Sequence, residues 1–297
     1  MSTETLTTLT PSSPLADRSA APPAAGHDDR SSIRDLWRDS LVFARRNVEH
    51  IRQIPEKLLD VTVQPLMFVL LFAYVFGGAI AVGGDPDGYR EYLIGGILIQ
   101  SLAFGMMGPA TSIATDLTEG VIDRFRSLPT SRAAYLIGHY LAELAGLVLS
   151  ITVLLGTGLI VGWRAHTDVL HVAEALAMLL VFATAMIWTG TWMGMKVRSA
   201  DAVMGIGFTL VFPLTFLSNA FVPIDSLPNV LQWVASVNPV SVLVAAVRTL
   251  FGNPLAPIVK DVWPMHHPVA AAWIYCAIAL AICVPGALRR YVARTRD

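Results

Sequence analysis

The sequence is poor in charged residues, in cysteine and in lysine, and each shortage excludes a class of protein. Only 14% of the residues are charged and 54% are hydrophobic, whereas an ordinary soluble domain has about 25% charged residues. The mean hydropathy is +0.58. A soluble domain is excluded by this composition, and no basic surface for nucleic acid stands out. The balance is typical of a membrane protein that crosses the bilayer several times.

The few cysteines and lysines do not form a chemical site. Cys276 and Cys283 fall on one helical face of the last apolar run, where we interpret them as buried apolar side chains, not as metal ligands. Lys57, Lys196 and Lys260 are the only lysines, and none of them follows a glycine. The G-x-x-x-x-G-K-[ST] loop that cradles nucleotide phosphates is therefore missing, as are the G-x-S-x-G and H-E-x-x-H motifs. We expect no catalytic residue, metal or cofactor in this chain.

Long apolar runs are what the sequence does contain. Each of six runs is close to the roughly 20 residues that a helix needs to cross a bilayer. They lie at about 58–82, 92–115, 136–162, 170–195, 201–222 and 268–288. Because only helices satisfy their own backbone in lipid without closing into a barrel, we predict an all-α integral membrane protein with six transmembrane helices.

The remaining segments complete the predicted organisation. Residues 1–32 are rich in Ser, Thr, Pro and Ala and are expected to form a disordered tail. Residues 33–57 have an apolar side and a basic side, which predicts an amphipathic helix beside the membrane. Residues 58–297 would form the transmembrane domain. Between spans five and six, two helices too short to cross singly predict an outer re-entrant hairpin. Arg248 in it could pair with an acid, meet lipid headgroups or stay exposed.

The distribution of arginine and lysine sets the orientation. If the N-terminus is cytoplasmic, the inner segments hold fifteen basic residues and the outer segments hold four, namely Arg90, Arg164, Arg248 and Lys260. Basic residues concentrate in cytoplasmic loops. We therefore predict a multi-pass protein of the cell membrane with both termini in the cytoplasm.

The inner loop after span two is predicted to contain a short two-faced helix. At the helical period, one set of its side chains is apolar and the other is charged, and Pro129 ends the pattern. The apolar set is Val121, Ile122, Phe125 and Leu128, and the charged set is Glu119, Asp123, Arg124 and Arg126.

Two groups of residues inside the spans are candidates for a transport path. Glu143 lies one helical turn after His139 in span three; the pair could line a path, relay a proton or simply form a buried hydrogen bond. Aromatic side chains in spans two and five could line a path for an apolar solute, or could serve only for helix packing. These aromatic residues are Phe104, Phe208, Phe212, Phe216 and Phe221.

Two separated motifs resemble a known family. The first comprises Glu119-Gly120, Asp123-Arg124, Ser127-Leu128-Pro129 and Arg132; the second comprises Asn219-Ala220-Phe221-Val222-Pro223, Leu227-Pro228, Asn238-Pro239 and Arg248-Thr249-Leu250. Together they resemble the type 2 ATP-binding-cassette (ABC) permeases, especially the daunorubicin-resistance-like exporters. The resemblance begins near Ile33 and continues to the end of the chain.

This resemblance implies a function and a set of partners. The helix at Gly120 to Ser127 would be a coupling helix that docks on a separate ATPase subunit, which would bind ATP and Mg. Its residues would be Glu119, Gly120, Asp123, Arg124, Phe125, Arg126, Leu128, Pro129 and Arg132. A second permease copy or a paralogue would complete a dimer among membrane lipids. The chain would then export a hydrophobic or amphipathic drug, antibiotic or complex lipid. The alternative is a proton-coupled carrier that uses Glu143 and His139.

Overall fold

The structure is a computed structural model, and it describes residues 63, 66–76, 86–120, 132–197, 199–221, 223–255 and 257–294. Every regular element in these ranges is a helix, in agreement with the all-α prediction. The predicted tail at 1–32, the predicted amphipathic helix at 33–57 and residues 121–131, which include most of the predicted coupling helix at 120–127, lie outside the described residues.

The described elements follow one another with short connections. In chain order they are η1 (Phe72–Phe76), α3 (Pro86–Phe104), α4 (Met107–Thr118), α6 (Arg132–Val161), α7 (Val169–Gly194), α8 (Ala200–Phe216), η2 (Ile224–Ser226), α9 (Asn229–Val237), α10 (Pro239–Phe251), α11 (Trp263–His266) and α12 (Pro268–Arg294).

Within the described ranges, four stretches of helix are long and apolar enough to cross a membrane. They are Gly88–Thr118 through α3 and α4, Tyr135–Val161 in α6, Val169–Gly194 in α7 and Pro268–Ala293 in α12. The first and fifth expected spans hold shorter apolar helices, at Leu66–Val75 and in α8. Helices α9 and α10 meet at a bend of 67° and together could make a fifth crossing. The chain is thus a multi-pass, all-helical membrane protein.

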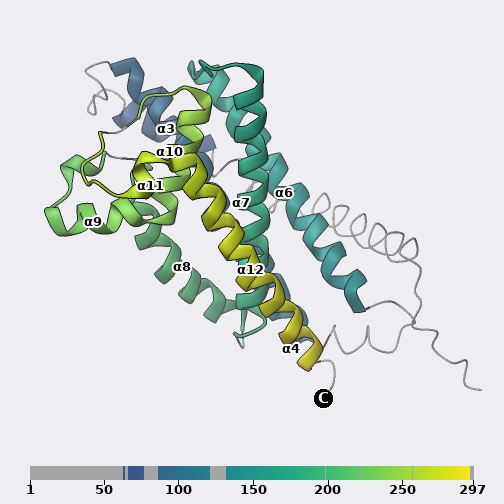
Figure 1. Ribbon diagram of the computed structural model, residues 1–297. Coiled ribbons are helices and arrows are strands. Elements are labelled where there is room, and N and C mark those ends of the chain that lie inside the picture. Colours follow the sequence, from purple (N-terminus) through teal and green to yellow (C-terminus); the bar gives the residue numbers. More distant parts are fainter. Residues whose placement is uncertain are drawn as a thin grey trace, which may run out of the picture.

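The helices form a bundle with two distinct ends, visible in Figure 1. At one end α4 stops, α6 and α8 begin and α12 finishes; we call this the loop end, because residues 121–131 connect there. At the opposite end α6 passes into α7, and α9, α10 and α11 gather; we call this the hairpin end. Helix α7 is central and packs against α4, α6, α10 and α12.

Capping residues explain where α10 begins and ends. The Asn238 side-chain oxygen accepts a hydrogen bond from the Val240 N–H at 2.9 Å, and Pro239 occupies the first turn, where its missing N–H costs nothing. Gly252 ends the helix with φ +69° and donates its N–H to carbonyls of the last turn. Glycine adopts this left-handed conformation readily. Asn238-Pro239 and Gly252-Asn253-Pro254 are thus sequence signals for the start and the end of this helix.

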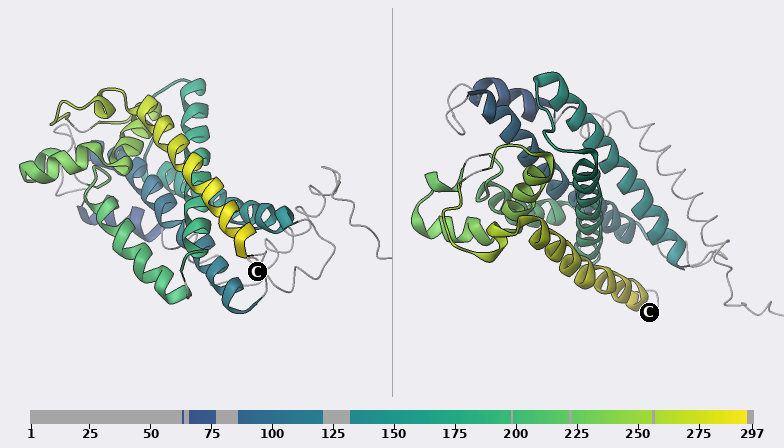
Figure 2. Two further views of the ribbon diagram at one scale, coloured as in Figure 1. Left: turned by 60° about the horizontal axis from the view of Figure 1, so that its bottom comes forward. Right: turned by 45° about the horizontal axis from the view of Figure 1, so that its top comes forward.

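Two glycines let α7 approach α4 with backbone against backbone. A Cβ atom on Gly190 would lie 2.1 Å from the carbonyl oxygen of Met106, and one on Gly194 would lie 2.4 Å from that of Ala110. Small residues four apart allow such close packing between membrane helices. The contact begins beside the break between α3 and α4, where Gly105 and Met106 interrupt span two. Figure 2 shows this central packing from two further directions.

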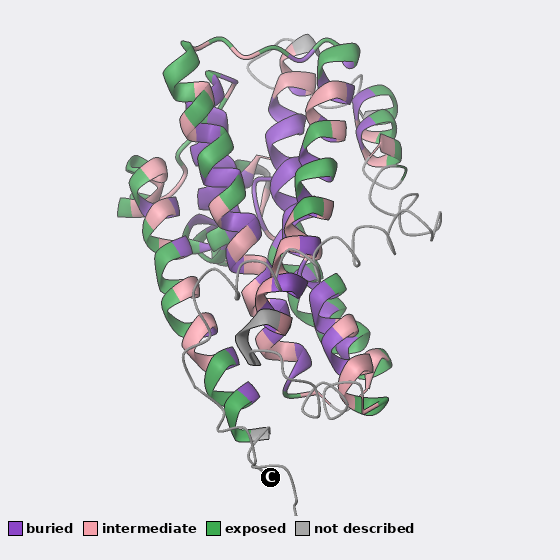
Figure 3. Cartoon of the chain, turned by 90° about the vertical axis from the view of Figure 1, so that its right-hand side faces the viewer, coloured by how far each residue is buried: buried purple, intermediate pink, exposed green. Residues whose placement is uncertain are grey.

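Burial is unevenly distributed over the bundle. The α3–α4 span is 78% buried over its most apolar window, whereas the α12 span is only 22% buried. In Figure 3 the purple residues lie where helices meet, and much of α12, which runs down to the C-terminus, is green. The apolar outer faces are those of a protein surrounded by lipid, because water would not accept so much exposed hydrocarbon.

Candidate functional site

The structure describes the two anchors of the predicted coupling helix, but not the helix itself. Glu119 caps the end of α4, and Gly120 follows with φ +65°. Arg132 is the first residue of α6. The remaining expected coupling residues, which are Asp123, Arg124, Phe125, Arg126, Leu128 and Pro129, lie outside the described residues. Both anchors belong to the loop end, so these residues connect two neighbouring membrane helices there.

Three of the expected path residues form one aromatic row. The rings of Phe212 and Phe216 stack with centroids 4.2 Å apart, and Phe221 lies 5.4 Å beyond Phe216. Phe221 also stacks on Phe72 of the first apolar helix at 4.6 Å. Such offset aromatic pairs are favourable beyond the area they bury. We call Phe72, Phe221, Phe216 and Phe212 the aromatic row; it joins α8 to the first apolar helix.

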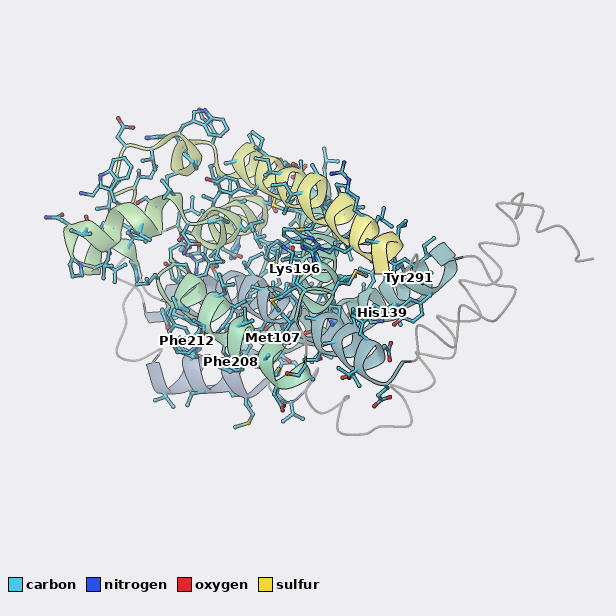
Figure 4. The ribbon with its side chains drawn as sticks, turned by 90° about the horizontal axis from the view of Figure 1, so that it is seen from below. Met107, His139, Lys196, Phe208, Phe212 and Tyr291 are labelled. Atoms are coloured by element: carbon cyan, nitrogen blue, oxygen red, sulfur yellow. The ribbon has the colours of Figure 1, made fainter. Side chains whose placement is uncertain are left out.

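Phe104 makes a separate aromatic contact lower on the same side. Its ring meets Phe208 of α8 edge to face, with centroids 5.6 Å apart. Phe104 immediately precedes the break in span two, so the contact joins α8 to the point where α3 becomes α4. In Figure 4, Phe208 and Phe212 follow one another along α8, with Met107 of α4 close by.

Helix α8 is packed along only one narrow stripe. Its buried residues are Val203, Gly207, Val211 and Thr215, four residues apart. Gly207 permits the contact with α4, because a Cβ atom there would lie 3.0 Å from the Met107 side chain. Most of the remaining circumference is open, and Phe208 and Phe212 are 49% and 47% exposed. We call this surface the open face of α8. It needs lipid, a second protein surface or an apolar solute against it.

Glu143 and His139 occupy a different part of the bundle. The Glu143 carboxylate lies over Gly108 of α4, where a Cβ atom would come within 3.1 Å of one of its oxygens. His139 is buried, and its ring is parallel to that of Tyr135 at 6.3 Å. Glu143 therefore lies between α6 and the start of α4, beside the break in span two, whereas the aromatic row joins α8 to the first apolar helix. The expected path residues thus fall into two groups.

At the hairpin end, Arg248 forms a buried site that the sequence did not reveal. The guanidinium is fully buried and donates to the carbonyls of Tyr92, Asn219 and Ala220 at 2.8, 2.9 and 3.0 Å. Its central carbon also lies 3.3 Å from the centroid of the Tyr92 ring. The expectations of an acidic partner, of headgroup contact or of an exposed side chain were wrong. The carbonyls of Asn219 and Ala220, just after α8, accept the hydrogen bonds that a carboxylate would otherwise accept.

Close packing completes this arginine cage, which comprises Arg248, Tyr92, Asn219 and Ala220. Tyr92 donates its hydroxyl to the Asn219 carbonyl at 2.8 Å. A Cβ atom on Gly96 would lie 2.0 Å from the Ala220 oxygen, so α3 can reach this chain segment only with glycine there. The signal in the sequence was the pairing of two motifs, Asn-Ala-Phe and Arg-Thr-Leu, whose residues meet in the cage.

A second set of contacts fastens the α6–α7 connection to the end of α10. The Trp163 indole donates to the Asn253 side chain at 2.8 Å, and Asn253 donates in turn to the Arg164 carbonyl at 2.8 Å. His166 shares a hydrogen bond of 2.7 Å with Glu91 of α3. The hairpin end is therefore cross-linked by polar contacts, whereas the open face of α8 is not.

Helix α9 has its polar side inward and its apolar side outward. The buried Gln232 side chain donates to the Leu227 carbonyl at 2.8 Å. The opposite stripe, formed by Val230, Trp233, Val234 and Val237, is exposed. In water this arrangement would be inverted. The outside of α9 is therefore an apolar environment, continuous with the lipid-facing surface of the bundle.

Comparisons with known proteins agree with this architecture. The chain is 29% identical over 266 residues to the daunorubicin resistance ABC transporter permease protein DrrB1 of Streptomyces coeruleorubidus, covering 90% of this chain and 84% of that one. It is 25% identical over 233 residues to the probable doxorubicin resistance ABC transporter permease protein DrrC of Mycobacterium tuberculosis, covering 76% and 80%.

A more distant relative comes from a different kind of organism. The putative transport permease ycf38 of Cyanophora paradoxa is 21% identical over 229 residues, covering 75% of this chain and 78% of that one. The family model described as ABC-2 type transporter matches residues 40–251. That match extends from before the first apolar helix to the end of α10 and includes the aromatic row, the open face of α8 and the arginine cage. The chain belongs to the ABC-2 type transporter family.

Proposed function

We propose that this chain is the transmembrane permease subunit of an ATP-driven exporter. Two permeases, either two copies of this chain or this chain and a paralogue, would form the translocation unit with two ATPase subunits. Those subunits would bind ATP and Mg at their own sites. The substrate would be a hydrophobic or amphipathic compound, such as a drug, an antibiotic or a complex lipid. Relatives named for daunorubicin and doxorubicin resistance support this class.

In the proposed topology the chain crosses the cell membrane six times. The helix at Leu66–Val75 belongs to the first span, α8 is the fifth, and α9 and α10 re-enter from the outer side. Lys196 and Arg289 lie at the loop end and Arg164 at the hairpin end. Together with the basic bias of the whole sequence, this supports a cytoplasmic loop end with both termini inside.

The observation that carries the proposal is the open face of α8. A helix packed along one stripe, with half-exposed phenylalanines on the other sides, can release its outer contacts without disturbing the core. Span two touches α8 at Phe104 of α3 and at Met107 of α4, so movement of α4 would change the position of the open face. An apolar solute could then pass between two such faces in a dimer.

The proposed mechanism begins on the partner subunits. ATP binding would close those subunits and displace the coupling helix at residues 120–127. The displacement would reach α4 and α6, which anchor the two ends of the loop. α4 would then shift against α8, opening a route for the solute outward or into the outer leaflet. The chain itself supplies shape and apolar surface, and the hydrolysis belongs to its partner.

The test is reconstitution with an ATP-binding subunit, which we expect a neighbouring reading frame to encode. We expect the two chains to co-purify, and inside-out vesicles to take up daunorubicin or a fluorescent lipid analogue only with ATP. Replacing Glu119, Asp123 and Arg124 by alanine should abolish uptake but leave ATP hydrolysis. Asp168→Ala, which removes an exposed carboxylate at the opposite end of the bundle, is the matched control. Full uptake by the triple variant would contradict the proposal.

The same vesicles distinguish the proton-coupled alternative. That carrier would transport without the ATPase, stop when an ionophore dissipates the proton gradient, and lose activity with Glu143→Gln. An ATP-driven exporter continues when the gradient is removed. Uptake that needs the proton gradient, and does not need ATP, would replace the proposed function with the alternative.

A further inference from the structure

The ends of α4 and α6 are joined by a side-chain bond next to the loop that connects them. Asp116 lies in the last turn of α4, and Tyr135 lies in the first turn of α6. The Tyr135 hydroxyl donates a hydrogen bond to an Asp116 carboxylate oxygen. A hydrogen bond to a charged acceptor is among the stronger ones available to a protein. Residues 121–131 therefore leave and re-enter the bundle at two helix ends held to each other.

The Tyr135 ring is itself part of a stack that extends to the C-terminal helix. Tyr291 of α12 lies parallel to Tyr135, with centroids 6.2 Å apart and an interplanar angle of 8°. His139 lies parallel on the same ring at 6.3 Å, also at 8°. His139 and Tyr291 are both buried, and Figure 4 shows them together at the loop end. Tyr135 therefore contacts α12 through Tyr291 as well as α4 through Asp116.

These residues belong to a small core separate from the main one. Its buried members come from α4, α6, α12 and the residue that caps α7, and are Ile113, Leu136, Met195, Ala287 and Tyr291. Tyr135, Trp188 and Trp192 pack on it. Close-packed interiors transmit displacement because they have little free volume. At the loop end α4, α6, α7 and α12 thus form one unit, which we call the end cluster.

Helix α8 begins outside the end cluster. Its first turns reach α4 through Val203, which packs on Ala110 and Ala114. One turn further along α8, Gly207 packs against the Met107 side chain. A unit of four helices therefore meets α8 along a narrow stripe of small side chains. Relative movement at the loop end is easiest along this stripe, because sliding there breaks no side-chain hydrogen bond of the end cluster.

From this geometry we propose that Asp116 and Tyr135 are positioning residues that couple the loop at 121–131 to α4, α6 and α12 as a single moving unit. The inference rests on the proposed function, in which a partner ATPase displaces that loop. With the Asp116–Tyr135 bond in place, force on the loop moves the whole unit against α8. Without it, only the apolar packing of the end cluster joins α4 to α6, and less of the displacement reaches the unit.

Conservative substitutions isolate the bond from the packing. Tyr135→Phe removes the hydroxyl and keeps the ring stack, whereas Asp116→Ala removes the acceptor from the other side. Asp116→Asn keeps an acceptor oxygen at the same place. Tyr140→Phe is the matched control, because Tyr140 shares a 3.1 Å hydrogen bond with Thr184 of α7. That change removes the same atom from the same helix, farther from the loop.

The measurement is the number of solute molecules moved per ATP hydrolysed, in vesicles holding the complete complex and using the probe that the wild type transports. We expect Tyr135→Phe and Asp116→Ala to co-purify with the ATPase and to hydrolyse ATP. Their transport per ATP should fall about tenfold, as expected from the loss of one charge-assisted hydrogen bond. Asp116→Asn should retain most of the ratio, and Tyr140→Phe all of it.

A double variant separates coupling from general loosening. If the two residues act through one bond, the double variant Asp116→Ala, Tyr135→Phe should show no lower transport per ATP than the more impaired of the two single variants. Additive losses, or an equal loss in Tyr140→Phe, would overturn the inference. So would native transport per ATP in Tyr135→Phe, while leaving the proposed function intact. A wild-type chain that neither binds nor stimulates the ATPase would instead overturn the proposed function, and the inference with it.

Discussion

The arginine cage offers the most direct test of how the hairpin end is held together. Arg248→Met keeps an unbranched apolar stem of similar length but removes all three hydrogen bonds to the carbonyls of Tyr92, Asn219 and Ala220. Asn219 retains one partner, because the Tyr92 hydroxyl also donates to its carbonyl. The buried Ala220 carbonyl, in contrast, loses the donor that the guanidinium provides.

The size of the effect follows from opposing contributions. Removing the charge recovers the cost of burying it, but breaking a buried charged network typically costs about 3 to 5 kcal/mol. Each hydrogen bond to a charged group contributes about 1.5 to 3 kcal/mol. A net loss of about 3 to 5 kcal/mol therefore agrees with three such bonds whose contribution is partly offset by the cost of desolvating the guanidinium. At a few degrees per kcal/mol, the apparent Tm should fall by roughly 10 °C.

Two companion variants give the prediction its specificity. Arg248→Lys keeps the charge, but a single ammonium cannot match the planar fork that reaches three carbonyls; we expect an intermediate Tm. Arg164→Met is the matched control, because Arg164 also donates to two carbonyls, at 2.7 and 2.8 Å, but is exposed. Loss of an exposed contact should cost less than about 1 kcal/mol.

The assay is thermal unfolding of the purified protein in lipid nanodiscs, followed by intrinsic tryptophan fluorescence and by the loss of the monodisperse peak in size-exclusion chromatography. The expected order of Tm is wild type and Arg164→Met, then Arg248→Lys, then Arg248→Met. If Arg248→Met melted together with Arg164→Met, the cage would contribute nothing to stability, and the reasoning from its hydrogen bonds would be refuted.

Three further predictions concern packing. Gly190→Ala should destabilise the protein by about 2 kcal/mol or more, because its new Cβ would lie 2.1 Å from a backbone oxygen. The control Gly146→Ala, where no atom lies within 4 Å of the new Cβ, should leave Tm unchanged or raise it. Equal changes in Tm would contradict the close α4–α7 contact. Phe221→Ala removes a buried ring and should lower the free energy of unfolding by about 3 to 4 kcal/mol. Phe212→Ala, on the open face, should reduce transport more than it lowers Tm. A large fall in Tm for Phe212→Ala, with little for Phe221→Ala, would contradict the assignment of Phe212 to the open face. Trp163→Phe should lower the free energy of unfolding by about 1 kcal/mol, because the indole hydrogen bond to Asn253 is lost. An unchanged melting curve would show that this bond contributes nothing to stability.

The helical membrane architecture could be predicted from the sequence because it depends on hydropathy over long windows. Runs of about 20 apolar residues need no knowledge of their neighbours to be recognised as candidate spans. The boundaries of α10 were also readable, since Asn238, Pro239 and Gly252 act on the adjacent backbone. The limits of the prediction appear with α8, whose 17 residues are short for a span. The hydropathy alone could not say where that helix ends.

The candidate site was harder to predict because its contacts join distant parts of the chain. The sequence offered an acid, a headgroup or solvent for Arg248, and the structure pairs it with main-chain carbonyls, which every residue carries. Glu143 and the phenylalanines were candidates for one path from different spans, and the sequence could not show that Glu143 faces α4 whereas Phe212, Phe216 and Phe221 stack in a row. The bond between Asp116 and Tyr135 could not be predicted, because nothing in the sequence links Asp116, near the end of one apolar run, to Tyr135, near the start of the next.

The arginine cage also has a consequence for biosynthesis. A charged side chain entering the bilayer without partners is costly, and the chain is made from its N-terminus. All three acceptors of Arg248, on Tyr92, Asn219 and Ala220, are synthesised before the arginine leaves the ribosome. The order of the segments therefore delivers every acceptor before the charge, and only the packing of α12 on α10 has to follow.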